Sequence, residues 1–240
     1  VLEKIDLVIE SGQVHALMGE NGAGKSTLMN ILTGLFPATT GTILIDNQEI
    51  AFSNPQIAEE AGLSFIHQEM NTWSEMTVLE NLFLGRELKT PIGFLDQKAM
   101  KLKAQAVFNR LGINIPLDTI ISQLSVGQQQ MIEIAKSLLS EISILIMDEP
   151  TAALTDRETE TLFNIISSLK NEGVGIVYIS HRMEEIFKIT DLVTVMRDGV
   201  VVDTKPTAET TPKELVKKMV GREMSDYYPE KNARIGDIAF

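Results

Sequence analysis

The residues best able to do chemistry in this sequence lie at positions 19–27, which read Gly-Glu-Asn-Gly-Ala-Gly-Lys-Ser-Thr. The stretch follows an apolar run ending at Met18 and precedes a helical pattern that includes Leu28, Met29 and Ile31. Glycines at this spacing let backbone N–H groups converge on a phosphate, and the following helix adds the positive end of its dipole. The stretch therefore predicts a nucleoside triphosphate site, the alternative being a plain glycine-rich turn.

Two side chains of this stretch have distinct expected roles. Lys25 would bring a positive charge to the β- and γ-phosphates, and Ser26 would offer its hydroxyl to Mg²⁺. If no phosphate binds, Lys25 is merely a solvated lysine. The residues expected to contact the nucleotide are Gly19, Asn21, Gly22, Ala23, Gly24, Lys25, Ser26 and Thr27.

A pair of carboxylates follows the apolar run at residues 144–147, which reads Ile-Leu-Ile-Met. Such a run predicts a buried strand that delivers Asp148 and Glu149 to its carboxyl end, where open α/β sheets bind ligands. Asp148 is expected to hold Mg²⁺, directly or through water, and Glu149 to orient or deprotonate the attacking water. Alone, the pair would be two solvated carboxylates. Together with the glycine-rich stretch, it predicts a nucleoside triphosphatase.

The apolar pattern of the rest of the chain predicts a mixed α/β fold. Alternation predicts strands over residues 2–9 and 14–18, and a short strand over 42–46 ends at an Asp-Asn turn. Continuous apolar runs at 142–147 and 174–179 predict buried parallel strands around a crossover helix.

Several helix starts carry their own signals. Thr77 with Glu80 and Thr155 with Glu158 have capping-box spacing. Asp198-Gly199 predicts a hairpin, and Thr211-Pro212 with Glu214 predicts a last helix. One further helix should bury a single face, made of Met100, Ala104, Val107, Phe108 and Leu111.

Charge and composition exclude several classes of protein. The net charge is −12, which disfavours wrapping nucleic acid or lying on anionic lipid. With no cysteine, the chain has no disulfide, thiolate chemistry or cysteine-ligated zinc. Its longest apolar runs span about six residues, well short of the roughly 20 that a membrane helix needs.

Residues 124–130 read Leu-Ser-Val-Gly-Gln-Gln-Gln and resemble the signature motif of ATP-binding cassette (ABC) proteins. The motif departs from the commonest form at Val126, where glycine is usual. The resemblance implies that Ser125, Gly127 and Gln128 cap a nucleotide held by a partner cassette. Independently, Ser125 can act as a helix N-cap, and both roles are compatible because a triphosphate also binds at a helix N-terminus.

The same resemblance implies roles that the residues alone do not. Gln68 matches a glutamine that binds Mg²⁺ and water, and His181 matches a histidine that contacts the γ-phosphate. His15, inside a strand, is expected to serve packing, and His67 could serve either purpose. Thr155 stands where many relatives have aspartate, so only its capping role is expected.

The resemblance is to a P-loop NTPase (RecA-like) fold over essentially the whole chain. It implies an α/β core with a mainly parallel sheet, an N-terminal antiparallel β element and an inserted helical subdomain at about residues 77–140. Residues 1–220 would form one ATPase domain and 221–240 a linker. The resemblance also implies an aromatic residue that stacks on adenine ahead of the first strand of the phosphate site. Since no aromatic residue precedes Phe36, that residue is expected upstream of residue 1.

Three segments, at 149–156, 179–187 and 197–199, look most like the ATPase of bacterial monosaccharide importers of the ribose and galactose type. That resemblance implies ATP and Mg²⁺ as cofactors and the N-terminal half of a tandem-cassette polypeptide. The implied partners are a second cassette, transmembrane permease subunits and, indirectly, a sugar-binding protein, without nucleic acid. The implied location is the cytoplasmic face of the cell membrane.

Two other functions remain open at this point. A soluble twin-cassette ATPase could act on ribosomes or DNA, although the acidic balance disfavours it. A non-hydrolysing ATP switch is also possible, but it would not need Gln68 and Glu149. Finally, Met70, Trp73 and Met76 could line a groove for a membrane-subunit helix, or Trp73 could simply pack a seam between core and insert.

Overall fold

A six-stranded sheet organises this chain. The structure is a computed structural model and describes residues 1–67 and 72–221. The strand order is β4-β5-β6-β1-β7-β8, and all neighbours are parallel except β7 and β8. The strands of this sheet are β1 (Val14–Met18), β4 (Leu63–Ile66), β5 (Ile144–Asp148), β6 (Gly175–Ile179), β7 (Leu192–Arg197) and β8 (Val200–Pro206). The mainly parallel sheet expected from the sequence is confirmed.

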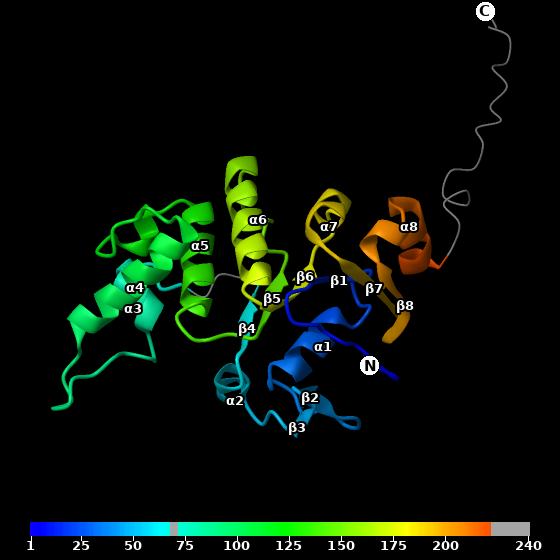
Figure 1. The fold of residues 1–240 in the computed structure, drawn as a ribbon, viewed down its shortest axis with the longest axis horizontal. Coiled ribbons are helices and arrows are strands. Elements are labelled where there is room, and N and C mark those ends of the chain that lie inside the picture. Colours follow the sequence, from blue (N-terminus) through cyan, green and yellow to red (C-terminus); the bar gives the residue numbers. More distant parts are fainter. Residues whose placement is uncertain (68–71, 222–240) are drawn as a thin grey trace, which may run out of the picture.

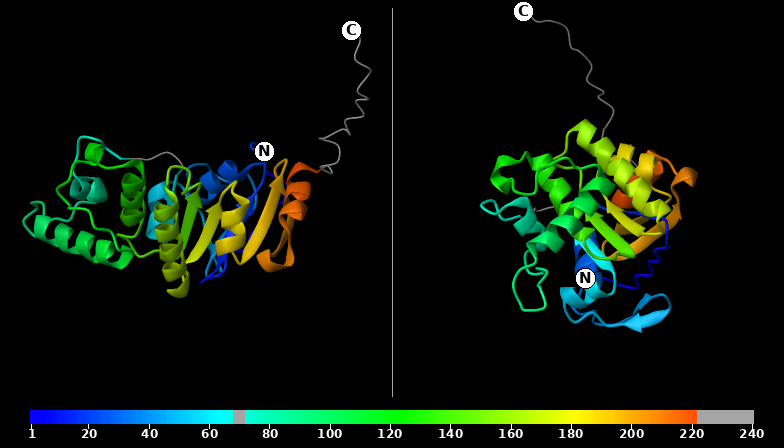
Figure 2. Two further views of the ribbon diagram at one scale, coloured as in Figure 1. Left: turned by 90° about the horizontal axis from the view of Figure 1, so that it is seen from above. Right: turned by 60° about the vertical axis from the view of Figure 1, so that its left-hand side comes forward.

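Helices cover both faces of the sheet (Figures 1 and 2). One face carries α1 and α2 and the other carries α5 to α8, as the two separate apolar cores show. The helices are α1 (Lys25–Leu32), α2 (Pro55–Glu60), α3 (Val78–Phe83), α4 (Gln97–Leu111), α5 (Val126–Ser137), α6 (Asp156–Asn171), α7 (Met183–Ile189) and α8 (Pro212–Val220), with short 3₁₀ turns η1 (Ile121–Gln123) and η2 (Thr207–Glu209).

The central strands are apolar throughout because both of their faces are buried. Along β6, Ile176 and Tyr178 face one core, while Val177 and Ile179 face the other. Burial on both sides is what a parallel sheet between two helical layers requires. It explains why β5 and β6 were predictable as continuous apolar runs, to within two residues at their amino ends.

The expected strand over residues 2–9 is not present. Among the described residues, 1–10 form no β-ladder. Instead, Leu2, Ile5, Leu7 and Ile9 pack half-buried on the core beneath α1. An alternation of apolar residues indicates that one side of a segment is buried, and residues 2–9 are buried on one side without pairing to another strand. The prediction was wrong in element type but right about which side chains face inward.

The antiparallel element closest to the N-terminus is the hairpin of β2 (Ile43–Ile45) and β3 (Gln48–Ile50). Asp46 and Asn47 form its two-residue turn with φ values of 50° and 62°. Positive φ at both central residues gives the turn a twist that matches the strands, and Asp and Asn tolerate this conformation better than most residues.

Helices α3, α4 and α5 pack on one another beside the edge strand β4 (Figure 1). The capping box of Thr77 and Glu80 opens α3 as predicted. The buried residues of α4 are the five that the helical pattern predicted, and Gly112 in the left-handed conformation ends the helix. Trp73, just before α3, exposes 63% of its surface, which does not fit the packing role considered for it.

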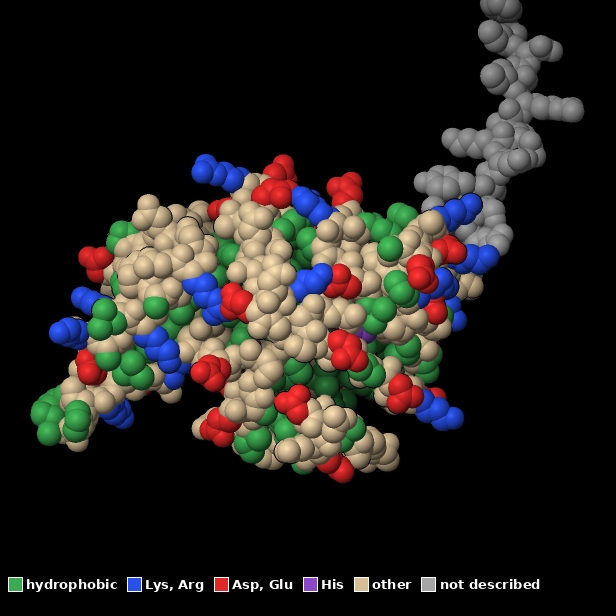
Figure 3. All heavy atoms as spheres, viewed as in Figure 1, with side chains coloured by type: hydrophobic (Ala, Val, Ile, Leu, Met, Phe, Trp, Pro, Cys, Tyr) green, Lys and Arg blue, Asp and Glu red, His purple; other side chains and the backbone are tan. Residues whose placement is uncertain are grey.

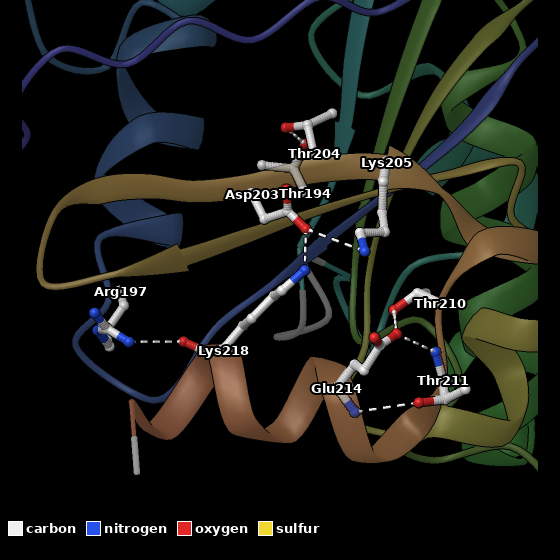
Figure 4. A network of polar contacts seen from close by, with 9 residues as sticks. All are labelled: Thr194, Arg197, Asp203, Thr204, Lys205, Thr210, Thr211, Glu214 and Lys218. Carbon is white, nitrogen blue, oxygen red and sulfur yellow. Dashed lines mark hydrogen bonds and ion pairs between the residues drawn. The ribbon is translucent and has the colours of Figure 1, made fainter. Parts of the chain in front are cut away.

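The last helix is fastened to the β7–β8 hairpin by polar contacts (Figure 4). Lys218 forms an ion pair with Asp203, and the Arg197 guanidinium donates to the backbone carbonyl of Lys218 over 3.0 Å. The Thr211 hydroxyl accepts a hydrogen bond from the Glu214 N–H, which completes the predicted capping box.

Two surface properties bear on possible partners. None of the helices in the described part of the chain is long and apolar enough to cross a membrane. On the face in Figure 3, Asp and Glu side chains lie among the Lys and Arg side chains, which do not merge into one continuous basic surface. This mixture accords with the net charge of −12.

Thr155→Ala should lower the free energy of unfolding by about 1 kcal/mol, because the Thr155 hydroxyl caps α6 through the Glu158 N–H. For a domain of this size, that corresponds to a fall of about 2–4 °C in Tm. Urea and thermal melts of the two proteins test it. Thr155→Ser, which keeps the hydroxyl, is the control and should melt close to wild type; equal loss in both variants would contradict a capping role.

Candidate functional site

The glycine-rich stretch forms the turn between β1 and α1. Gly24, the N-cap of α1, has φ 102°, and Gly22 has φ 87°. A Cβ at Gly19 would lie 2.4 Å from the Met196 carbonyl oxygen, so only glycine fits there. Because Gly24 has no side chain to cap the helix, the N–H groups of its first turn remain available to an anion.

Lys25 closes over its own loop. Its Nζ donates to the carbonyl oxygen of Gly19 over 2.7 Å and to that of Glu20 over 3.2 Å. Burial lowers the pKa of Lys25, while the charges of Asp148 and Glu149 act in the opposite direction. The ammonium group therefore lies between the loop and the carboxylates, held by carbonyl oxygens that a phosphate oxygen could replace.

The remaining nucleotide-contact candidates follow Lys25 into α1 or precede it in the loop. Asn21, Gly22 and Ser26 are exposed, Thr27 is half-buried and Ala23 is buried. Ala23 packs into the core beneath the turn.

The two predicted carboxylates stand at the carboxyl end of β5. Asp148 is its last residue and pairs in register with Ile179 of β6. Glu149 follows with φ 47°, a left-handed conformation that is uncommon for residues other than glycine. Its N–H donates to the Ile179 carbonyl over 2.9 Å, so the strained residue is still tied to the sheet.

His181 is brought to Glu149 from the next strand. Its Nε2 lies 2.8 Å from Oε1 of Glu149, and their side chains are 45% and 24% exposed. The parallel pairing of β5 and β6 makes this contact possible, because both segments emerge at the same edge. A histidine and a carboxylate in hydrogen-bond contact can orient a water molecule and receive its proton.

Negative charge at Asp148 is costly in this setting. Burial raises the pKa of Asp148, as does the neighbouring charge of Glu149, while Lys25, His67 and His181 oppose that rise. A cation at this point would relieve the cost. Mg²⁺ in such sites is commonly held by one or two carboxylates together with substrate phosphates and water. Among the described residues, no group of three His, Asp or Glu is arranged to hold a metal ion.

The other two histidines, His15 and His67, differ in their surroundings. His15 is buried, donates from Nδ1 to the Val8 carbonyl over 3.0 Å and accepts from the Thr194 hydroxyl over 2.7 Å. Burial lowers its pKa against the effect of the Val8 carbonyl. Its full burial inside β1 fits the packing role expected for it. His67 follows β4; burial lowers its pKa and the charge of Asp148 opposes this. His67 therefore borders the site, which sequence reasoning left undecided.

Ser125, Gly127 and Gln128 lie away from the glycine-rich turn. They begin α5, which packs on β4. In the sheet, β4 lies three strand positions from β1, which is a distance of about 14 Å between the two strands. Ser125 and Gln128 form a capping box, so the capping role is confirmed. Gly127 is buried against the Glu158 carboxylate, and a Cβ there would lie 2.3 Å from it.

Gln68 and Met70 lie outside the described residues, which resume at residue 72. No sequence pattern singles out Glu185, although it is a buried carboxylate near His181. As the second of two adjacent acidic residues in the first turn of α7, it resembles an exposed residue that favours the helix dipole. Only its position four residues after His181 could have directed attention to it.

Comparisons with known proteins agree with this geometry. A family model described as "ABC transporter" matches residues 2–152. The "Ribose import ATP-binding protein RbsA" of Streptococcus agalactiae serotype Ia is 77% identical over 240 residues, covering 100% of this chain and 49% of that protein. The protein of the same name from Lactococcus lactis subsp. lactis is 70% identical, with the same coverage. The chain thus spans about half the length of the curated relatives it matches.

A solved structure extends the likeness to three dimensions. The crystal structure of the ADP conformation of MJ1267, an ATP-binding cassette of an ABC transporter, has a TM-score of 0.78 to this chain. The two are 26% identical, and the match covers 92% of each. Because the family match covers more than half of the sequence, this chain belongs to the ABC transporter family.

Proposed function

We propose that this chain binds MgATP at the β1–α1 turn and hydrolyses it to power the import of a sugar. The contact that carries the proposal is the 2.8 Å approach of His181 to Glu149, beside Asp148. These groups come from the carboxyl ends of β5 and β6 and face the lysine of a phosphate-binding turn. Such an arrangement is what in-line attack of water on a terminal phosphate needs.

Nucleotide binding rests on the turn and the start of α1. Lys25 exchanges its two carbonyl contacts for β- and γ-phosphate oxygens, while the N–H groups of the turn and of the first helical turn surround the phosphates. Ser26 and Asp148 would hold Mg²⁺, which neutralises phosphate charge when it is bound. The raised pKa of Asp148 supports this assignment, because a cation would favour the ionised carboxylate.

Hydrolysis rests on the side chains beyond the strand ends. Glu149 orients the attacking water and receives its proton, and His181 contacts the γ-phosphate from the neighbouring segment. Gln68 is proposed as a further ligand of Mg²⁺ and water on the family resemblance. Glu149 is already tied to the sheet through its N–H, which keeps its carboxylate near His181 before nucleotide arrives.

A complete site is proposed to need a second cassette. Ser125, Gly127 and Gln128 begin α5 on the far side of β4, so they are placed to meet a nucleotide held by another cassette. For Gly127 to reach it, the Glu158 carboxylate must move aside. In the relatives, the matched region is about half of the protein, which leaves room for a second cassette in one polypeptide.

The transported substrate is proposed to be ribose, because the relatives at 70–77% identity are named ribose import ATP-binding proteins. The working assembly would add permease subunits and a sugar-binding protein, with this chain at the cytoplasmic face of the membrane. Residues 1–220 would act as one ATPase domain, with a helical insert at about 77–140 and a linker at 221–240. Trp73, exposed beside α3, is proposed to receive a permease helix.

Lys25→Ala should weaken MgATP binding by about 1.5–3 kcal/mol, the scale of a charge-assisted hydrogen bond, or roughly 10- to 150-fold in Kd. Isothermal titration calorimetry of the chain measures it. Lys101→Ala removes an exposed lysine of α4 and is the matched control. An unchanged Kd for Lys25→Ala would remove Lys25 from the phosphate site.

Glu149→Gln should keep MgATP affinity while lowering turnover by at least about 100-fold, since a positioned general base contributes on that order. Phosphate release is measured in the full-length polypeptide assembled with its permease in vesicles, alongside ribose uptake. Phosphate release and ribose uptake should fall together. Near-normal turnover would place the general base elsewhere, and uptake that continues without turnover would separate this ATPase from import.

Asp148→Asn should raise the Tm of the nucleotide-free chain and remove most of its stabilisation by MgATP. The pKa of Asp148 is raised in the folded state, so at neutral pH its ionised form favours unfolding, and an amide removes that cost. At 100 times Kd, MgATP should stabilise the wild type by about 2.7 kcal/mol, or about 5–10 °C. Thermal melts with ATP, with and without Mg²⁺, give both values; a lower Tm of the empty variant would contradict the electrostatic account.

A further inference from the structure

A buried carboxylate behind the site makes four polar contacts. Glu185, in the first turn of α7, is 4% exposed. Its Oε1 accepts from the Thr151 hydroxyl over 2.8 Å and lies 2.9 Å from an Arg182 guanidinium nitrogen. Its Oε2 accepts from the Tyr178 and Ser180 hydroxyls, each over 2.8 Å. All of these partners lie within three residues of Glu149 or His181.

The contacts join two segments that are distant in sequence. Thr151 lies two residues after Glu149, whereas Ser180 and Arg182 flank His181. The Ser180 hydroxyl also accepts from the Arg182 N–H over 3.1 Å, which shapes the turn that carries His181. Through these side chains, the Glu185 carboxylate links the segment that follows Glu149 to the residues on both sides of His181.

Burying the negative charge of Glu185 costs free energy, which its four polar contacts offset. A carboxylate only accepts hydrogen bonds, so each of the three hydroxyls must donate to it. Burial, the charge of Glu185 and its hydrogen bond all raise the pKa of Tyr178, which keeps that hydroxyl protonated. Packing alone does not require such a network, because replacing a buried ion pair together with its partners by apolar side chains is often neutral or stabilising. The network instead fixes distances and directions.

Fixing the Glu149 segment matters because its backbone is strained. A left-handed conformation at a residue other than glycine persists only where surrounding contacts determine it. Here those contacts are the bond from Glu149 N–H to the Ile179 carbonyl, the bond from Ala152 N–H to the Glu149 carbonyl over 3.2 Å, and the Thr151–Glu185 bond.

We propose that Glu185 is a positioning residue for ATP hydrolysis, which sets the separation of Glu149 and His181 through Thr151 and Ser180. The inference rests on the proposed roles of Glu149 and His181 and assigns Glu185 no contact with nucleotide. It predicts an effect on the chemical step rather than on binding, because displacing a reacting group by about 1 Å can cost 100-fold in rate.

The test uses the full-length polypeptide assembled with its permease, with Glu185→Gln and Thr151→Val as the main variants. Each should lower kcat about 10- to 100-fold and leave KM for ATP and Kd for MgATP within about twofold. Thr151→Ser, which restores the hydroxyl, should recover most of the kcat lost in Thr151→Val. Glu184→Gln removes the exposed neighbouring carboxylate and serves as the matched control, with kcat unchanged.

A second measurement separates positioning from a general loss of structure. In a Glu149→Gln background, single-turnover hydrolysis should fall little further when Glu185→Gln is added, because Glu185 acts through Glu149. Additive losses, unchanged kcat in both Glu185→Gln and Thr151→Val, or loss of MgATP binding together with kcat would each overturn the inference. If the wild type itself releases no phosphate from ATP, the proposed function fails first, whereas normal hydrolysis by Glu149→Gln would remove only the role of Glu149 and with it the inference about Glu185.

Discussion

Parallel pairing of β6 with β5 on one side and with β1 on the other brings three chain segments to one edge of the sheet at the same height. Asp148 is level with Ile179, and Ala16 is level with Tyr178, so the segments that follow begin within two residues of one another. The phosphate-binding turn, the carboxylates and His181 meet only because of this register. A slip by one residue would exchange the two faces of β5 between the two cores and shift Asp148 out of line with Ile179.

Within that frame, the site is a balance of charges that water only partly screens. Lys25 is held among carbonyl oxygens opposite two carboxylates, and burial raises the pKa of Asp148. Such an arrangement stores free energy in the empty protein that a bound cation and an anionic ligand would release together. Residues suited to binding are therefore not the residues that would make the empty chain most stable, a conflict common at functional sites.

Much of this could be predicted from the sequence because it depends on local chemistry. The glycine-rich turn, the capping boxes of Thr77, Thr155 and Thr211, and the apolar strands β5 and β6 all follow from nearby residues. The failed strand at residues 2–9 shows the limit, since pairing depends on distant segments whereas alternation reports only burial. The same limit hid Glu185, whose four partners come from two separate stretches of chain, at Thr151 and at residues 178–182. The contact of Gly127 with Glu158 likewise depends on how two helices pack.

The backbone at Glu149 also restricts which residues could replace it. At φ 47°, a β-branched side chain such as Val, Ile or Thr would collide with its own backbone, while Asn, Asp and Gly adopt this conformation with less strain. Two requirements therefore restrict the residue at position 149: the site needs a carboxylate, and the turn needs a residue that tolerates a positive φ. Replacements that lack both a carboxylate and a β-branch alter the chemistry and leave the turn intact, whereas β-branched ones disturb both. A sequence library built at this position would consequently separate into a folded, inactive class and a class that loses the local structure as well.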